Sequence, residues 1–369
     1  MVHAAATFAG GAFWIAPRKL MATACSFMTY ETMKSETSIS FEDLVSLLRR
    51  VFIRAGVAER NAVALATNCA MCERDGSLSH GIFRIPGYLS SLRSGWVDGC
   101  AVPLVEDVSP AVVRVDARNG FAQPALAAAR PVLLDKVKHC GSALVAIRVS
   151  HHFSALWPDV EPFAREGFVA MSFVSGLACV IPPGGRQPVF GTNPMAFASP
   201  VAGADPLVFD HATSALSNGD VRIAAREGHA VPAGSGVDCN RQPTVDPRAI
   251  LNGGALLPFG GHKGASIMLM IEILASALTG GQFSAEVDFS QHPGAETPKT
   301  GQLLMVVDPE RGGNDAFAHR VRHLLDSVRE AGQRRVPGDR RYARRKLSEE
   351  GIPVSLGQLA ELTMLANSR

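Results

Sequence analysis

The chain has 369 residues, a formal net charge of +2, 47% hydrophobic and 19% charged residues. This composition is typical of a folded globular enzyme and excludes a disordered chain, and the length suggests two or three domains. The nearly neutral charge gives no reason to expect nucleic acid or a membrane surface as a partner. Seven cysteines, an odd number, do not indicate a disulfide framework, so we expect a reducing, cytoplasmic compartment.

Residues 1–27 differ from the rest of the chain. The apolar stretch 4–17 is too short to span a bilayer. Its basic neighbours, Arg18 and Lys19, follow the apolar part, which is the wrong order for a secretory signal. Because later methionines are alternative start sites, we expect residues 1–27 to be a disordered extension outside the fold.

Helical patterns dominate the next part of the chain. Ser40, with an acidic residue three positions later, is a capping-box-like start, and the apolar repeat after it ends at Gly56. A second helix is predicted over 59–74, and a third over 81–93, bent or started late by Pro86.

Strands and helices alternate in the remainder, which predicts an α/β fold. The predicted strands are 102–108, 112–115, 143–149, 168–174, 206–210 and 302–307. The predicted helices are 123–138, 159–165, 217–226, 265–279 and 316–331. No G-x-G-x-x-G motif follows any of these strands, so a Rossmann fold is not supported, and a nicotinamide cofactor must be held in another way.

The stretch from Ser79 to Arg84 is the first candidate site. If the chain is helical from His80 onward, His80 and Arg84 project from the same helix face. An arginine can hold a carboxylate bidentately while the histidine moves a proton. On spacing alone, an ordinary helix start with a surface arginine is the more frequent explanation.

Three further stretches place polar groups or glycines where an α/β protein binds ligands. His151-His152-Phe153-Ser154-Ala155-Leu156 follows a predicted buried strand. Gly191-Thr192-Asn193-Pro194 is a tight turn whose hydroxyl and amide groups are predicted to face a ligand. Gly260-Gly261-His262-Lys263-Gly264 precedes an apolar helix, where free N–H groups favour an anion.

Basic residues cluster near the carboxyl end of the chain. The members are Arg334, Arg335, Arg340, Arg341, Arg344, Arg345 and Lys346. The Pro337-Gly338 pair inside the cluster favours a shaped, phosphate-binding loop over the alternative, a solvated helix face. Elsewhere, Cys69 and Cys72 match a C-x-x-C pattern within a predicted helix, with no second pair, so packed cysteines are favoured over a redox or metal site.

Taken in order, these motifs resemble the malate/L-lactate dehydrogenase family of non-Rossmann nicotinamide oxidoreductases. Within that family the sequence is most similar to the Δ1-piperideine-2-carboxylate/Δ1-pyrroline-2-carboxylate reductases. That branch is indicated by His152–Leu156, by Asn218-Gly219-Asp220-Val221-Arg222 and by Arg335–Arg341. The resemblance covers roughly residues 38–360. It implies a multi-domain homodimer with a mixed sheet, surrounding helices, and a cofactor and substrate held between domains.

The resemblance also implies roles for individual residues. His80 is the proton donor, with Ser79 and Asp220 as relay partners, and Arg84 and Thr192 hold the substrate carboxylate. We expect His80 to be protonated, favoured by the Asp220 carboxylate. The implied contacts to NADP (NADPH) are His152, Phe153, Ser154, Ala155, Leu156, Asp210, His211, Ala212, His262, Lys263, Arg335, Val336, Pro337, Gly338, Asp339, Arg340 and Arg341.

Two details qualify these cofactor contacts. The arginine-rich loop is the best sequence argument for NADP over NAD, because a 2′-phosphate needs neutralising charge. His211 is a departure from the family pattern, since an apolar residue or Met is expected there. Backbone contacts of residues 210–212 would survive that change.

We expect three parts in the chain beyond residues 1–27. Residues 28–142 with about 315–369 form a helical, substrate-side domain. Residues 143–314 form an NADP-binding region with a helical subdomain around 217–281. The implied activity is NADPH-dependent reduction of Δ1-piperideine-2-carboxylate to L-pipecolate and of Δ1-pyrroline-2-carboxylate to L-proline. The alternatives are a 2-keto-acid dehydrogenase of the same family, a thiol redox or metal-binding protein using Cys69 and Cys72, and a catalytically silent binding protein.

Overall fold

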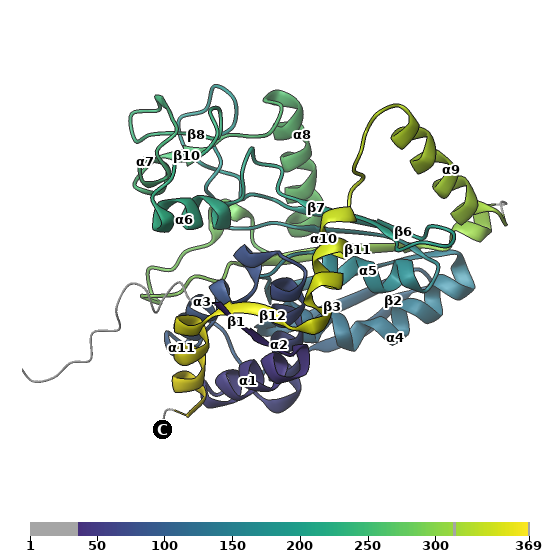
Figure 1. Ribbon diagram of the computed structural model, residues 1–369, viewed down its shortest axis with the longest axis horizontal. Helices are drawn as coiled ribbons and strands as arrows, with labels where there is room; N and C mark the ends of the chain where they lie inside the picture. The colour runs from purple at the N-terminus through teal and green to yellow at the C-terminus, as the bar shows by residue number, and fades with distance from the viewer. Residues whose placement is uncertain (1–35, 313–314, 368–369) are drawn as a thin grey trace, which may run out of the picture.

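A seven-stranded sheet runs through the middle of the protein (Figure 1), and the computed structural model describes residues 36–312 and 315–367. Its strand order is β2-β3-β4-β11-β5-β6-β7. The strands are β2 (Leu104–Ser109), β3 (Val112–Phe121), β4 (Ser142–His151), β5 (Val169–Val174), β6 (Met195–Ser199), β7 (Leu207–His211) and β11 (Lys299–Val307). Strands β3 and β4 are parallel and the other neighbouring pairs are antiparallel. The predicted mixed α/β architecture is therefore confirmed.

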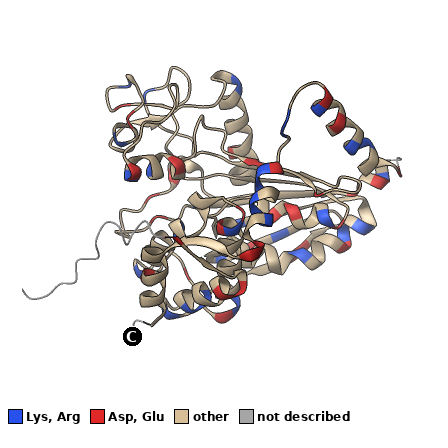
Figure 2. Cartoon of the chain, viewed as in Figure 1, with Lys and Arg blue, Asp and Glu red and all other residues tan. Residues whose placement is uncertain are grey.

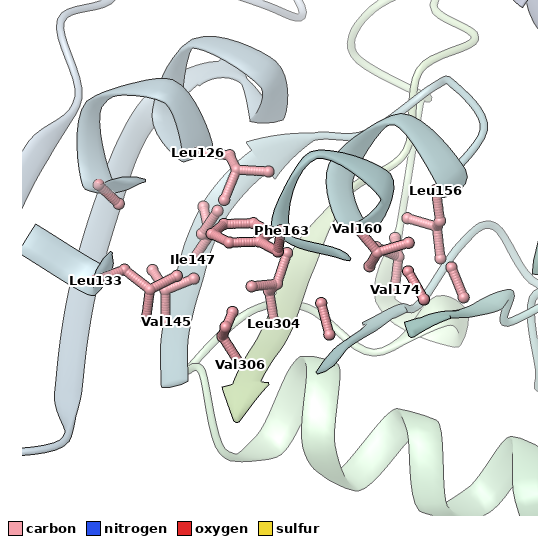
Figure 3. Packing of buried hydrophobic residues seen from close by; sticks show 14 of the residues in the cluster. Leu126, Leu133, Val145, Ile147, Leu156, Val160, Phe163, Val174, Leu304 and Val306 are labelled. Carbon is pink, nitrogen blue, oxygen red and sulfur yellow. The ribbon is translucent and has the colours of Figure 1, made fainter. Parts of the chain in front are cut away.

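One face of the sheet is covered by two helices, α4 (Ala122–Cys140) and α5 (Trp157–Arg165). Figure 3 shows the contact: Phe163 of α5 lies against Ile147 of β4 and Leu304 of β11. All three side chains are almost fully buried, and burial of each stabilises the fold by about 1.5–3 kcal/mol. Gly141, in the left-handed conformation, ends α4 and turns the chain into β4.

The amino-terminal helices form a second core beside the sheet. This unit contains α1 (Phe41–Arg54), α2 (Glu59–Arg74), α3 (Ile85–Arg93), the carboxyl-terminal α11 (Leu356–Asn367), and the strand pair β1 (Glu36–Ile39) and β12 (Ile352–Ser355). The Ser40 hydroxyl caps α1 by accepting the Asp43 N–H at 3.0 Å, as the sequence indicates. The bounds of α2 agree with the predicted helix.

The third predicted helix starts four residues late. Leu78–His80 and Ile82–Arg84 form separate 3₁₀ turns, divided by Gly81, whose backbone (φ −92°, ψ −130°) is not helical. The expectation that His80 and Arg84 share one helix face is therefore wrong. The two side chains are brought together by a bent connection instead.

A smaller lobe lies on the other side of the sheet (Figure 1). It contains α6 (Asn218–Glu227), α7 (Pro247–Leu251), short strands β8 (Gly236–Val237), β9 (Pro243–Thr244) and β10 (Ala255–Leu256), and α8 (His262–Ile271), which continues as a π-helix over Glu272–Ala277. The apolar side of α8 and of the π-helix packs on the sheet around Phe173 and Leu303. The predicted helix 265–279 thus begins at His262.

Two helices lie in the arginine-rich part of the chain, α9 (Phe317–Glu330) and α10 (Asp339–Leu347). The prediction of a loop through residues 335–341 is wrong from Asp339 onward, because α10 starts directly after Gly338. Figure 2 shows basic residues along α10, which stands beside the sheet. Short 3₁₀ turns at Ser284–Glu286, Pro309–Gly312 and Ser348–Glu350 complete the described elements.

The described residues contain no helix that is both long and apolar enough to cross a membrane. Residues 1–27, predicted to be disordered, lie outside the described residues. The sheet takes β2 and β3 from the part of the chain assigned to the helical domain, so it crosses the expected boundary at residue 142. The domain division itself stays a prediction.

Candidate active site

The candidate site lies at one end of the sheet. Strands β4, β5 and β7 end there, and β6 and β11 begin there, as their register shows. A cavity of about 550 Å³ opens at this end, between the sheet, the turn at 76–80 and the start of α6. Of the residues singled out from the sequence, it is lined by Ser79, His80, Ser154, Ala155, Leu156, Thr192, Asp210, His211, Ala212, Asp220, Arg340 and Arg341.

His80 is held in place by its neighbour. The Ser79 hydroxyl is 3.1 Å from Nδ1 of His80, which leaves Nε2 without a hydrogen bond among the described residues. Burial, and then the positive charges of Arg84 and His152, lower the pKa of His80 well below its ordinary value. Without a substrate, burial therefore disfavours the imidazolium that the resemblance implies for His80.

Asp220 lines the same cavity near the first turn of α6. Its N–H donates to the hydroxyl of Ser217, the helix cap, at 3.0 Å. Within residues 36–312 and 315–367 no hydrogen bond joins Asp220 to His80. Ser79 and His80 are therefore in direct contact and Asp220 lines the same cavity, while the relay itself stays a prediction.

Arg84 lies in a smaller adjoining cavity of about 100 Å³, together with His80, His152 and Thr192. Its guanidinium stacks over Phe153 at 4.2 Å, and its Nε is buried without a hydrogen-bond partner. Among the residues that the structure describes, none forms an ion pair with it. Burial, opposed in part by neighbouring acids, lowers the pKa of Arg84 to about 10. A partly buried arginine with a buried, unpartnered Nε and no counter-ion is a ready site for a carboxylate.

Glu73, which was not singled out from the sequence, supports the turn between His80 and Arg84. Its carboxylate accepts the Ile82 N–H at 2.9 Å, and it lies so close to Gly81 that a Cβ there would sit 2.1 Å from Oε2. Burial raises the pKa of Glu73 to about 7. Helical spacing could have indicated this residue, because Glu73 lies on the same helix face as Ala66 and Ala70, which are both buried.

The loop after β4 is tied to β7 by Asp210. Its Oδ2 accepts the N–H groups of Leu156 and Trp157 at 2.7 and 2.9 Å, so the carboxylate caps the start of α5. His211, the departure from the family pattern, stacks on Phe209 with ring centroids 5.3 Å apart and still lines the cavity. The predicted contact region 210–212 is thus present at the cavity wall.

Several singled-out residues lie elsewhere. Asn193 does not face the cavity: it is fully buried, and its amide donates to Glu272 at 2.9 Å. His262 and Lys263 begin α8 in exposed positions and are not among the residues that line the cavity at the sheet end. Asp339 accepts the Val336 N–H at 2.9 Å and lines a separate hollow beneath α9.

Residues 39–363 match the family model described as malate/L-lactate dehydrogenase. The chain belongs to this family. It is 60% identical over 330 residues to the Δ1-pyrroline-2-carboxylate/Δ1-piperideine-2-carboxylate reductase of Pseudomonas syringae pv. tomato, which covers 89% of this chain and 96% of the relative. The Pseudomonas putida protein of the same name is 55% identical over 339 residues, covering 92% and 99%.

A solved structure agrees with these matches. The crystal structure of Δ1-piperideine-2-carboxylate reductase from Pseudomonas syringae superimposes with a TM-score of 0.88 at 60% identity, covering 89% of this chain and 99% of that chain. The resemblance stated from the sequence motifs is therefore confirmed. As a member of this family the protein is an oxidoreductase. Membership of a dehydrogenase family implies a nicotinamide cofactor.

The cavity walls fit such a cofactor. A second hollow of about 380 Å³ continues the large cavity past Gly76 and Ser77 and is lined by Arg335, Val336, Pro337 and Gly338. Arg340 and Arg341 line both hollows. The guanidinium of Arg341 stacks over Trp157 at 4.6 Å, while its Nε and Nη1 are buried without a partner. An anionic group in the groove would satisfy these donors.

The C-x-x-C pair has a different environment. Cys69 and Cys72 are free, fully buried thiols on α2. Burial raises the pKa of Cys69, and it raises that of Cys72 to about 12, which disfavours a reactive thiolate. Within the described residues no group of three metal-ligating side chains occurs.

Proposed function

We propose that this protein reduces cyclic imino acids that carry a 2-carboxylate, with a reduced nicotinamide as hydride donor. The products are L-pipecolate from Δ1-piperideine-2-carboxylate and L-proline from Δ1-pyrroline-2-carboxylate. The observation that carries the proposal is the partly buried guanidinium of Arg84, which has an unpartnered Nε and no ion pair among the described residues, in a small cavity beside His80. Relatives at 55% and 60% identity carry the names of such reductases, which supports the same substrate class.

The bound cofactor supplies the hydride for C2 of the imine. Arg84 binds the substrate carboxylate through two parallel N–H···O bonds, and the Thr192 hydroxyl donates a third. These three hydrogen bonds fix the orientation of the substrate ring, and with it the positions of C2 and of the imine nitrogen in the cavity. The Nε2 of His80, which points away from Ser79, is the nitrogen available to hand a proton to the substrate nitrogen.

Substrate binding also changes the charge state of His80. The positive charge of Arg84 is one cause of the lowered pKa of His80. A carboxylate on Arg84 neutralises that charge, so the pKa of His80 rises when the substrate binds and a proton is taken up with it. Ser79 holds the ring in position through Nδ1, and Asp220 adds negative charge at the mouth of the cavity.

We infer that the cofactor is NADPH rather than NADH, held by the loop 152–156, by residues 210–212 and by the stretch 335–341. Two arginines, Arg340 and Arg341, line the groove, and Arg341 has unpartnered donors. Arg340→Ala should therefore reduce the ratio of kcat/KM for NADPH to that for NADH by about tenfold or more, since a phosphate–arginine pair is worth at least about 1.4 kcal/mol. An intact ratio contradicts the 2′-phosphate assignment. The contact of His262 and Lys263 with the cofactor remains a prediction of the family pattern.

We propose further that two copies of the chain form a cytoplasmic dimer. On α8, the π-helix and the turn that follows it, Leu269, Ile273 and Leu278 are each about half exposed, at 53%, 51% and 54%. A contiguous apolar helix face of this kind is typical of a subunit interface. Sedimentation of the wild-type protein and of an Ile273→Glu variant tests this, because a monomer in both cases contradicts it.

The substrate proposal is tested by NADPH oxidation with Δ1-piperideine-2-carboxylate, Δ1-pyrroline-2-carboxylate and pyruvate, side by side at equal concentrations. We expect both imino acids to exceed pyruvate in kcat/KM. A clear preference for pyruvate supports the keto-acid dehydrogenase instead. If no nicotinamide cofactor raises the melting temperature, the protein is a binding protein of another kind.

A further inference from the structure

A second histidine faces the substrate cavity. His152 lines the hollow of about 100 Å³ that also contains His80 and Arg84. Its Nε2 is 3.0 Å from Oδ2 of Asp159, and both side chains are nearly fully buried, with 3% and 5% of their surface exposed. Its Nδ1 has no hydrogen-bond partner within residues 36–312 and 315–367. One ring nitrogen is therefore fixed by a carboxylate and the other is free at the cavity.

The carboxylate of Asp159 is itself held in place. Gln302 of β11 donates from Nε2 to the same Oδ2 at 2.7 Å and to the Ser172 hydroxyl at 3.0 Å. The imidazole of His152 thus has a fixed orientation, set by a carboxylate that is itself anchored to the sheet. This is the arrangement in which an acid orients a histidine for proton transfer.

The adjacent histidine shows that this arrangement is specific to position 152. His151 uses both ring nitrogens inside the core, with Nδ1 2.9 Å from the Thr297 hydroxyl and Nε2 3.1 Å from the Asn119 amide oxygen. Burial lowers the pKa of His151 to about 3, so it remains neutral. His151 supports the end of β4, whereas His152 presents a free nitrogen to the cavity.

The proposed reaction has a use for two proton donors. Hydride addition to C2 of a neutral imine moves the C=N π electrons to nitrogen, which takes one proton to become a secondary amine. An amine of this type is as basic as a lysine side chain, with a pKa near about 10, so it takes up a second proton at neutral pH. A keto acid reduced to a hydroxy acid takes up only one. An imine site that releases an ammonium product therefore needs two protons for each hydride.

We propose that His152, oriented by Asp159, is a second proton donor of the substrate cavity. This inference rests on the proposed reduction of cyclic imines. His80 donates the first proton from Nε2, the nitrogen lone pair of the new amine takes the second from Nδ1 of His152, and both imidazoles are protonated again from solvent. The charged and titratable groups around His152 are Asp159 on α5, His80 and Arg84 on the two 3₁₀ turns, Asp210 at the end of β7, and Arg222 and Glu296, which line the same cavity.

The test compares three variants with the wild-type enzyme in the reduction of Δ1-piperideine-2-carboxylate. His152→Gln should lower kcat, measured at saturating NADPH, by about 10²-fold, the usual contribution of a general acid, whatever its effect on the Kd of NADPH measured by fluorescence. Asp159→Asn keeps the hydrogen bond but removes the charge that favours imidazolium, so the alkaline limb of the kcat–pH profile should move to lower pH. Added imidazole should restore part of the activity of His152→Ala.

The opposite results are equally clear. If His152→Gln weakens NADPH binding and leaves kcat unchanged at saturation, His152 only supports the cofactor loop and the inference is overturned. An unmoved pH profile in Asp159→Asn, with the melting temperature retained, overturns it as well. A wild-type protein that does not reduce the cyclic imine refutes the proposed function instead, so the two failures are distinguishable.

Discussion

Replacement of Arg84 by methionine tests the substrate site most sharply, because stability and activity should change in opposite directions. The lowered pKa, about 10, means that burial and neighbouring charges disfavour the protonated guanidinium by about 3 kcal/mol at neutral pH. Methionine removes this cost and retains apolar contact with Phe153. It forfeits the stacking at 4.2 Å, which is worth about 1–2 kcal/mol. We therefore expect an unchanged or higher melting temperature.

Substrate capture should suffer much more. Two charge-assisted hydrogen bonds to a carboxylate contribute about 3–6 kcal/mol together, so kcat/KM for the imino acid should fall by about 10²- to 10⁴-fold. The loss should appear mainly in KM, with the Kd of NADPH unaffected. Arg93→Met, which replaces an exposed arginine at the end of the following helix α3, is the matched control and should leave both quantities unchanged. An unchanged KM in Arg84→Met refutes the carboxylate assignment, and a strongly lowered melting temperature refutes the view that Arg84 is unpaired.

The other predictions concern the groups around Arg84. His80→Asn should lower kcat by about 10²- to 10⁴-fold with NADPH binding intact, and lost cofactor affinity would instead indicate a structural role. The folded pKa of Glu73, about 7, lies above its unfolded value, so the native state binds more protons and stability falls as pH rises from about 4.5 to 7. Glu73→Gln should remove this fall, giving a higher melting temperature than wild type at pH 8 and no gain near pH 4.5, and parallel curves would contradict the burial of that carboxylate. Replacing Cys69 and Cys72 together with alanine should leave specific activity within about twofold, whereas its loss would favour a thiol mechanism.

The elements that were predicted well from the sequence are those whose own residues show a clear periodic pattern of apolar positions. Helix α2 has the predicted bounds because its buried residues recur at helical spacing and Asp75-Gly76 ends the pattern. Strand β6, five residues long and directly after the turn at Asn193, has too short a pattern to be separated from that turn. Its pairing with β5 and β7 is a tertiary property.

The start of helix α10 was predicted as part of a loop because of the Pro337-Gly338 pair directly before it, and the helix itself has no buried residues that would mark it. Its stability comes from distant partners: the Arg345 guanidinium pairs with Asp75 at 2.5 Å and with Glu161 at 2.7 Å. These acids lie on other elements, at the end of α2 and in α5, so no local pattern reveals them. The same ion pairs hold the start of α10, and with it Arg340, beside the cofactor groove.

The candidate site was predicted as a set of residues but not as a geometry. Family motifs indicated His80, Arg84 and Thr192, and the structure brings these three around one small cavity. The helical spacing offered as the reason was wrong, since Gly81 breaks the helix between the two residues. The lowered pKa of His80 and the support from Glu73 depend on burial and on contacts across the chain, which single-sequence patterns do not specify.

The most direct measurement is a crystal structure of the ternary complex with NADP⁺ and L-pipecolate. The account predicts the pipecolate carboxylate within hydrogen-bond distance of the Arg84 guanidinium and the Thr192 hydroxyl, with the ring nitrogen facing His80. Binding of the amino acid anywhere that leaves Arg84 without a carboxylate would contradict it.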